Sequence, residues 1–303
     1  MTTITEDRDP VRTSWPALHG PQITAAVEQY GLHRAGARQP LWEYTRQLWG
    51  RRRFIWAYST ASNAVGYSRS FLGQAWQVLT PMLNVAVYYF VFGLLLNSKR
   101  GIHNFIAFLA VGVFVFGFSV ASINSGSRAV TANLGLTRAL HFPRAVLPIS
   151  TTLIALLQLL YSMVILIPLV LITGEPLTWR WFELVPAFAL QACFSLGLAF
   201  IVARIGAKVP DASQTLPFAT RVWFYLSGVM YSVHVFGREH SHWMRAVLEC
   251  NPGNVYLTLA RHALLRGNPL TTRDILLAIG WAVVPLVLGY LYFWRGEEEY
   301  GNV

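Results

Sequence analysis

Six long apolar segments divide this 303-residue chain, and they restrict its fold more than any other feature. A helix needs about 20 residues, at a rise of about 1.5 Å each, to cross the hydrocarbon core of a membrane. Charged residues make up only 13% of the chain, too few for the surface of a soluble domain of this size. The sequence therefore predicts an all-α polytopic membrane protein. The six predicted transmembrane helices cover residues 75–96, 105–124, 147–172, 183–205, 217–236 and 275–294.

The chain before the first apolar segment falls into two parts. Residues 1–40 are polar and have no apolar stretch of the kind found in a cleavable signal peptide, so we expect a mobile cytoplasmic tail. Residues 41–69 are the predicted interfacial segment. Within it, over 41–56, apolar and tryptophan side chains share one helical face and polar and arginine side chains the other, which predicts an N-terminal interfacial amphipathic helix that contacts membrane lipid. Packing on a soluble domain is the alternative, but no such domain follows. Residues 70–303 are then the six-span transmembrane domain.

The distribution of basic residues predicts the orientation. With the N-terminus inside, 16 of the 24 lysines and arginines lie on the cytoplasmic side. This bias favours a multi-pass protein of the bacterial cytoplasmic (inner) membrane with both termini in the cytoplasm. Because the arginines alternate with apolar runs instead of gathering on a soluble face, they do not predict nucleic-acid binding.

Five of the outside basic residues lie in one segment, 237–274. Asn251 and Pro252 interrupt it, and the apolar run that follows is too short to cross the membrane. A re-entrant hairpin before the last span, with the chain returning to the side it came from, accounts for both facts. Arg261 on the return segment needs an anionic or carbonyl partner, either within the hairpin or on the cargo. We predict that Asn251, Pro252 and Arg261 form part of a gate.

Several kinds of chemistry are missing from the sequence. There is no nucleotide-binding P-loop, and no acidic residue lies well inside a span, where a proton- or sodium-coupled transporter usually keeps one. His234, His240 and His242 lie close together, but no further ligand completes a metal site. We therefore predict no catalytic residue, no metal site and no cofactor in this chain.

Polar and aromatic residues inside the spans are candidates for contact with cargo. Asn84, Tyr88 and Phe92 are spaced by four residues and share one helical face, and Phe108 and Phe116 enrich the second span in aromatic rings. Aromatic faces can stack on sugars. Core or lipid-facing packing is the alternative for these rings, and Asn84, Gln158 and Gln191 could simply form hydrogen bonds between helices.

Three motifs resemble a known family. They are residues 72–81 (LGQAWQVLTP), residues 140–148 (LHFPRAVLP), and Asn251-Pro252 with Arg261. Together they resemble the permease subunits of ABC-2 type polysaccharide exporters, the Wzm-like family, over residues 41–303. The end of the chain, 294–301 (WRGEEEYG), is similar to the subgroup that exports the mycobacterial galactan. One departure is the stretch 63–71, where family members often carry a basic run and this chain has only Arg69.

The resemblance implies a transporter subunit that is not itself an enzyme. Two copies of the chain would assemble with two copies of a separate, Wzt-like ATP-binding subunit, which would hold ATP and Mg. The cargo would be a lipid-linked polysaccharide on a polyprenyl-pyrophosphate carrier. Closure of the ATPases would widen a channel at the interface between the two permeases.

The loop between the second and third spans is the predicted contact with the ATPase. Phe142 offers an exposed aromatic ring, Pro143 ends a short helix, and Arg144 offers a planar cation, a combination common at protein interfaces. The alternative is an ordinary turn that only orients the third span. The residues assigned to ATPase coupling are Arg138, His141, Phe142, Pro143 and Arg144.

Other functions remain open at the level of sequence. Within transport, the cargo could be teichoic acid or a small lipophilic molecule. An integral membrane glycosyl- or acyltransferase would need an acid–base pair that the loops do not offer convincingly. A passive scaffold for an envelope complex is a third alternative. A co-purifying ATPase would distinguish a transporter from the last two.

Overall fold

The computed structural model describes residues 40–68, 73–95, 102–135, 142–209, 211–233, 242–298 and 300, and within these ranges every regular element is a helix. The predicted tail 1–40 lies outside this part except for Pro40. Among the described residues, five helices are long and apolar enough to cross a membrane. Three of them are single helices: α5 (Phe105–Ser127), α7 (Val146–Ile172) and α13 (Thr272–Arg295). The span Trp76–Leu95 comprises α4 (Trp76–Tyr88) and a π-helical extension (Tyr89–Leu95). The span Trp179–Lys208 includes α8 (Leu184–Lys208). They confirm five of the six predicted spans.

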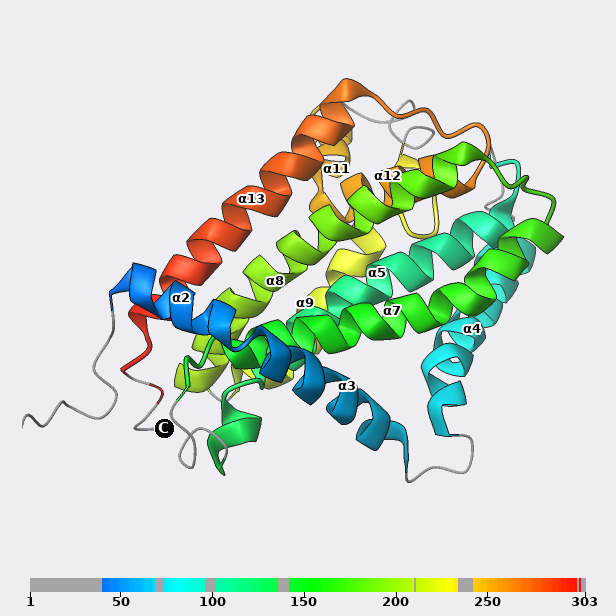
Figure 1. The fold of residues 1–303 in the computed structure, drawn as a ribbon. Helices are drawn as coiled ribbons and strands as arrows, with labels where there is room; N and C mark the ends of the chain where they lie inside the picture. Colours follow the sequence, from blue (N-terminus) through cyan, green and yellow to red (C-terminus); the bar gives the residue numbers. More distant parts are fainter. Residues whose placement is uncertain are drawn as a thin grey trace, which may run out of the picture. The chain divides into compact units, whose positions relative to one another are not determined.

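α5, α7, α8 and α13 form a bundle of long helices that lie side by side (Figure 1). α5 is the most buried of the five candidate spans, because it packs against α4, α7 and α8 at once. The C-termini of α5, α8 and α13 and the N-terminus of α7 lie together at one end of the bundle. We call this the α2 end, because helix α2 (Leu41–Gly50) contacts the end of α13 there.

Glycines allow the helices of the bundle to approach closely. A Cβ atom on Gly197 of α8 would lie 2.4 Å from the backbone nitrogen of Leu286 in α13, and one on Gly289 would lie 2.2 Å from the carbonyl oxygen of Gly197. Likewise, a Cβ on Gly206 would lie 2.1 Å from the carbonyl oxygen of Ser127 in α5. Small residues at crossings let helix backbones pack against each other in a membrane, where burial of apolar side chains alone provides little driving force.

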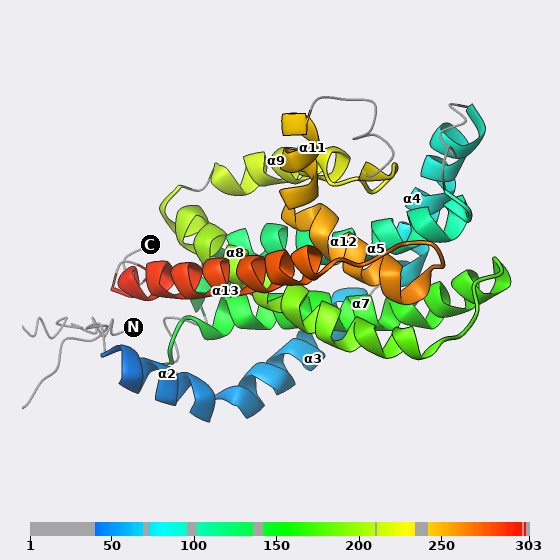
Figure 2. The same ribbon diagram turned by 90° about the horizontal axis from the view of Figure 1, so that it is seen from above.

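The segment predicted to lie on the membrane forms two helices, α2 and α3 (Arg52–Ser68), separated at Arg51. They lie on one side of the bundle, whereas α9 (Ala212–Leu226) and α11 (His242–Cys250) lie on the opposite side (Figure 2). Ile55 of the predicted apolar face is buried, whereas Trp42, Trp49 and Trp56 are exposed. These rings remain available for contact with lipid.

The prediction of a continuous helix over 217–236 is wrong. α9 ends at Leu226 and has 15 residues, fewer than a perpendicular crossing requires. The chain turns at Gly228, whose φ of +66° suits glycine. Helix α12 (Pro252–Leu264) then follows α11 after a break at Asn251, so the segment predicted as a hairpin contains two short helices.

Candidate functional site

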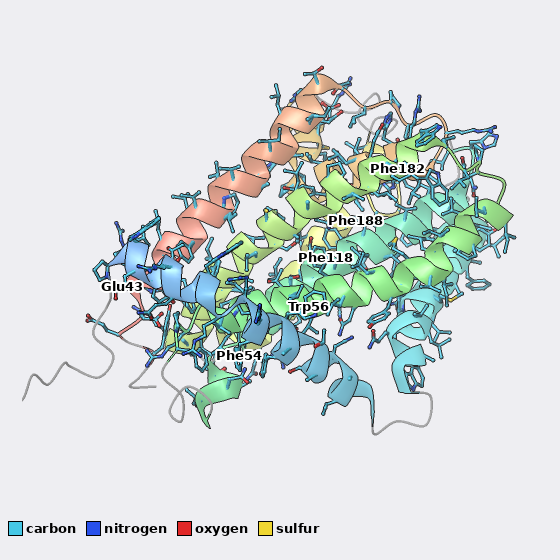
Figure 3. All side chains as sticks on the ribbon, in the orientation of Figure 1. Glu43, Phe54, Trp56, Phe118, Phe182 and Phe188 are labelled. Carbon is cyan, nitrogen blue, oxygen red and sulfur yellow. The ribbon has the colours of Figure 1, made fainter. Side chains whose placement is uncertain are left out.

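A pocket of about 350 Å³ lies between α4, α5 and α7. Of the predicted cargo-contacting residues, Asn84 lines this pocket, and Tyr88, Phe92, Phe108 and Phe116 are not among its lining residues. Phe118 of α5, which Figure 3 labels, also lines it. Asn84 and Gln158 are thus the two polar residues predicted inside spans that line this pocket.

Amide side chains from three helices meet beside the pocket. Asn63 of α3 accepts hydrogen bonds through Oδ1 from Nε2 of Gln77 (3.3 Å) and from Nε2 of Gln158 (3.4 Å). Gln77 and Gln158 line the pocket from α4 and α7. Gln191 lies elsewhere, and its Nε2 donates to the carbonyl oxygen of Val115 and to Oγ of Ser119. Gln158 and Gln191 thus form hydrogen bonds between helices, and Gln158 also lines the pocket.

The other predicted channel aromatics take part in packing. The ring of Tyr88 lies 5.5 Å from that of Phe224, and the ring of Phe116 lies 4.6 Å from that of Trp223, measured between centroids. These contacts connect α4 and α5 to α9. Phe92 is half-buried against the same core, and Phe108 is buried. Sequence reasoning missed Trp223 and Phe224, which hold α9 against the bundle.

Arg261 of α12 is buried, and its guanidinium group binds backbone carbonyl groups. Nη1 donates to the carbonyl oxygen of Gly228 (2.9 Å), and Nη2 donates to those of Val229 (2.8 Å) and Phe108 (3.3 Å). The guanidinium carbon lies 3.3 Å from the centre of the Phe108 ring. A Cβ on Gly112 would lie 2.7 Å from Nη2, so this glycine leaves room for the arginine. Arg261 therefore connects α5, α12 and the turn after α9.

Asn251 and Pro252 have a local role in starting α12. Oδ1 of Asn251 accepts from the backbone N–H of Gly253 (2.9 Å) and from Nε1 of Trp223 (2.8 Å). Its Nδ2 donates to the carbonyl oxygen of Leu226, the last residue of α9. Pro252 occupies the first turn of α12, where a missing N–H costs nothing. This asparagine thus caps the start of one helix and binds the end of another.

A buried carboxylate joins three distant segments at the α2 end. The Tyr44 hydroxyl donates to Oε2 of Glu297 (2.8 Å), and the backbone N–H of Arg144 donates to Oε1 (2.9 Å). The Arg144 guanidinium donates to the Glu297 carbonyl oxygen, and the Tyr44 hydroxyl accepts from the N–H of Ala145 (3.1 Å). We call Tyr44, Arg144 and Glu297 the Glu297 clasp. It connects α2, the loop before α7 and the end of α13.

Burial dominates the electrostatics of the clasp. It raises the pKa of Glu297 above its ordinary value, against the opposing effects of the Arg144 N–H, the Tyr44 hydroxyl and the Arg144 charge. Burial also raises the pKa of Tyr44, and the neighbouring Glu297 carboxylate adds to this effect. The hydroxyl of Tyr44 therefore stays protonated and able to donate to the carboxylate.

The three predicted ATPase-coupling residues that the structure describes are buried or half-buried. Phe142 is half-buried, with its ring centroid 5.8 Å from that of Phe54 in α3 (Figure 3 labels Phe54). Pro143 is buried, and Arg144 belongs to the Glu297 clasp. Arg138 and His141 lie outside the described residues. Sequence reasoning missed Tyr44 and Glu297; the acidic run 297–299 so close to the last span was a signal for the latter.

The ABC-2 type transporter family matches residues 53–265, which is more than half of the chain. The chain belongs to this family. This membership makes the protein the membrane subunit of a transporter, and not an enzyme, and it implies an ATP-binding partner. Since the described part of the chain contains several helices long and apolar enough to cross a membrane, this ABC-2 permease is a multi-pass membrane protein.

Two relatives of this permease carry the same name. It is 27% identical over 222 residues to the O-antigen export system permease protein RfbA of Myxococcus xanthus, covering 73% of this chain and 83% of that protein. It is 25% identical over 178 residues to the O-antigen export system permease protein RfbA of Klebsiella pneumoniae, covering 58% of this chain and 68% of that protein. The similarity therefore extends over most of both relatives.

Proposed function

We propose that this permease is the membrane subunit of an ATP-driven exporter of a polyprenyl-pyrophosphate-linked polysaccharide. The observation that carries the proposal is the similarity to the Myxococcus xanthus O-antigen export permease over 83% of that protein's length. The resemblance of residues 294–301 to the mycobacterial subgroup favours a galactan, with a role in cell wall biogenesis. Two copies of the chain and two ATP-binding subunits form the proposed exporter.

The proposed topology has six crossings of the inner membrane and both termini in the cytoplasm. In this arrangement the α2 end faces the cytoplasm, α2 and α3 lie at the interface, and the exposed rings of Trp42, Trp49 and Trp56 contact lipid. The sixth crossing needs α9 together with residues that follow it. Helices α11 and α12 then form the re-entrant hairpin on the outer side.

Reporter fusions test this topology. A reporter joined after residue 10 and one joined at residue 303 should both report the cytoplasm, because 16 of the 24 basic residues lie on that side. Insertion of the same reporter after Gly267, in the exposed turn between α12 and α13, should report the opposite side and serves as the control. A periplasmic signal from either terminal fusion would contradict the six-crossing topology.

The contact with the ATPase can be tested at Phe142. Alanine at this position removes the ring that packs on Phe54, so we expect at least a several-fold loss of co-purified ATP-binding subunit and of ATP-driven export, at unchanged abundance of the permease. The measurement is affinity purification of the permease from cells that express both subunits, followed by an export assay.

Phe182→Ala is the matched control for this experiment. Phe182 is an exposed phenylalanine that stacks on Trp179 at the opposite end of the bundle, so its removal should leave ATPase binding unchanged. Equal ATPase recovery by wild type and Phe142→Ala would place the contact on another cytoplasmic element. Failure of the wild-type permease to bind any ATP-binding subunit or to export a glycan would contradict the proposed function.

A further inference from the structure

The pocket between α4, α5 and α7 contains an acceptor with no donor among the described residues. Gln77 is 8% exposed, and its Oε1 is buried with no hydrogen-bond partner, although its Nε2 binds Asn63. A buried oxygen that keeps an unused acceptor position is costly unless a donor reaches it. Oε1 is not itself open to the pocket, but Gln77 lines it, so a turn of this amide brings the oxygen to a donor that occupies the pocket.

Gly117 keeps the pocket open at its α5 side. Between Phe105 and Asn124 it is the one exposed residue of this otherwise buried or half-buried helix. A Cβ atom built on it would have no atom within 4 Å, whereas a Cβ on Gly112 in the same helix would clash with Arg261. Close packing of helices therefore does not require a glycine at position 117. The missing side chain instead leaves open the space in the pocket that a ligand would fill.

The residues around the pocket determine which ligand chemistry it can take. The described residues that line it include no charged side chain, so they offer no partner for a pyrophosphate. They do include the amides of Gln77, Asn84 and Gln158 and the hydroxyls of Thr80 and Ser162. Trp76 adds a partly exposed aromatic ring. Amides and hydroxyls beside aromatic rings suit a neutral, hydroxyl-bearing ring with apolar C–H faces.

We infer that this pocket binds a sugar unit of the exported glycan, and not the pyrophosphate of its carrier. The inference rests on the proposed function for the identity of the glycan. The volume of about 350 Å³ is near the lower end of ligand pockets, about 300–1,000 Å³, so it suits one or a few sugar rings and not a long chain. A sugar hydroxyl donates to Oε1 of Gln77 once this amide has turned toward the pocket, and the amide of Gln158 and the ring of Trp76 contact the same unit.

Protection from chemical labelling tests this site. In the assembled permease–ATPase complex, with Cys193 and Cys250 replaced by serine, Thr80→Cys places a thiol in the pocket wall on α4. One probe is a synthetic polyprenyl pyrophosphate that bears a galactan oligosaccharide, and the other is the same carrier without sugar. The sugar-bearing probe should slow maleimide labelling of this thiol at least fivefold, and the sugar-free carrier should not.

Gly117→Leu fills the pocket without removing a contact. Gly280→Leu is its matched control, because Gly280 is an exposed glycine within the spanning helix α13 whose Cβ would also have no atom within 4 Å. In the Thr80→Cys background, Gly117→Leu should abolish protection by the sugar-bearing probe and reduce export at least tenfold, whereas Gly280→Leu should retain both. Leucine favours a helix more than glycine does, so folding is not at risk from the backbone.

Three results would overturn the inference. Equal protection by both probes would show that the pocket holds the carrier lipid. If the complex exported the sugar-bearing probe but the probe did not protect the thiol, the pocket would hold water only. The proposed function would then stand without this site. Protection that survives Gly117→Leu would place the ligand elsewhere. A different result would separate the two proposals. If the complex exported no glycan but the sugar-bearing probe still protected the thiol, the proposed function would be contradicted and the sugar site would stand.

Discussion

Replacing Arg261 with alanine should prevent most of the permease from accumulating in folded form. The change leaves the carbonyl oxygens of Gly228 and Val229 without the donors that Arg261 supplies, and it removes a third hydrogen bond, to the carbonyl oxygen of Phe108 within α5. Each unsatisfied buried group costs about 1–3 kcal/mol, so we expect a loss of about 4 kcal/mol or more, a large part of the stability of an ordinary protein. The measurement is the yield and the thermal unfolding midpoint of the detergent-purified protein, followed by size-exclusion chromatography.

Arg261→Lys and Arg273→Ala test the cause of this loss. Lysine keeps the charge but not the planar fork, so it can satisfy only part of the carbonyl set and should give an intermediate midpoint. Arg273 is largely exposed and pairs with Glu249 at 3.2 Å, so Arg273→Ala should cost less than about 1 kcal/mol. If Arg261→Ala instead accumulated and unfolded like the wild type but lost export, the arginine would act on cargo and not on the fold.

Replacing Glu297 with alanine should disconnect α2 and the loop before α7 from the end of α13. The Tyr44 hydroxyl and the Arg144 N–H lose their acceptor, at about 1–3 kcal/mol for each group that stays buried, and α2 loses its hydrogen bond to the end of α13. If the loop before α7 contacts the ATPase as proposed, we expect at least a tenfold loss of ATP-driven export, because movement of this loop would no longer be transmitted to α2. Glu298→Ala, at the exposed neighbouring residue, should retain export. Equal export by both variants would contradict a role for the clasp.

Glu297→Gln removes the titratable carboxyl group of the Glu297 clasp but keeps a side chain of nearly the same size. Because burial raises the pKa of Glu297, the folded protein keeps this proton at pH values where the unfolded chain has lost it. The stabilisation from this group is therefore complete below the ordinary pKa of 4.5 and is lost as the pH rises through the raised value. Subtracting the unfolding midpoint of Glu297→Gln from that of the wild type should give a difference that falls with rising pH. A difference that is constant with pH would show that the carboxylate is not buried in this way.

The candidate site was predictable in part. The sequence placed Asn84 and Gln158 inside spans, and both line the pocket in the structure. It also identified Arg261 as a residue that needs carbonyl or anionic partners, and the partners are carbonyl groups of α5 and of the turn after α9. It did not indicate Gly117 or Gln77, because an unused acceptor and an empty volume arise only where several helices meet. Phe142 looked like an exposed ring, whereas the fold packs it on Phe54.

The amino-acid sequence by itself determined the helical class, five spans and the family, because apolar length and short motifs are local properties of the chain. Only the tertiary structure decided which apolar faces are buried in protein, since lipid-facing and core side chains are equally apolar in a membrane protein. It also decided where α9 ends, because Arg261, 32 residues beyond Val229, binds carbonyl groups in the turn that follows that helix. In the same way, 253 residues separate Tyr44 from Glu297, and no periodicity in the sequence relates them.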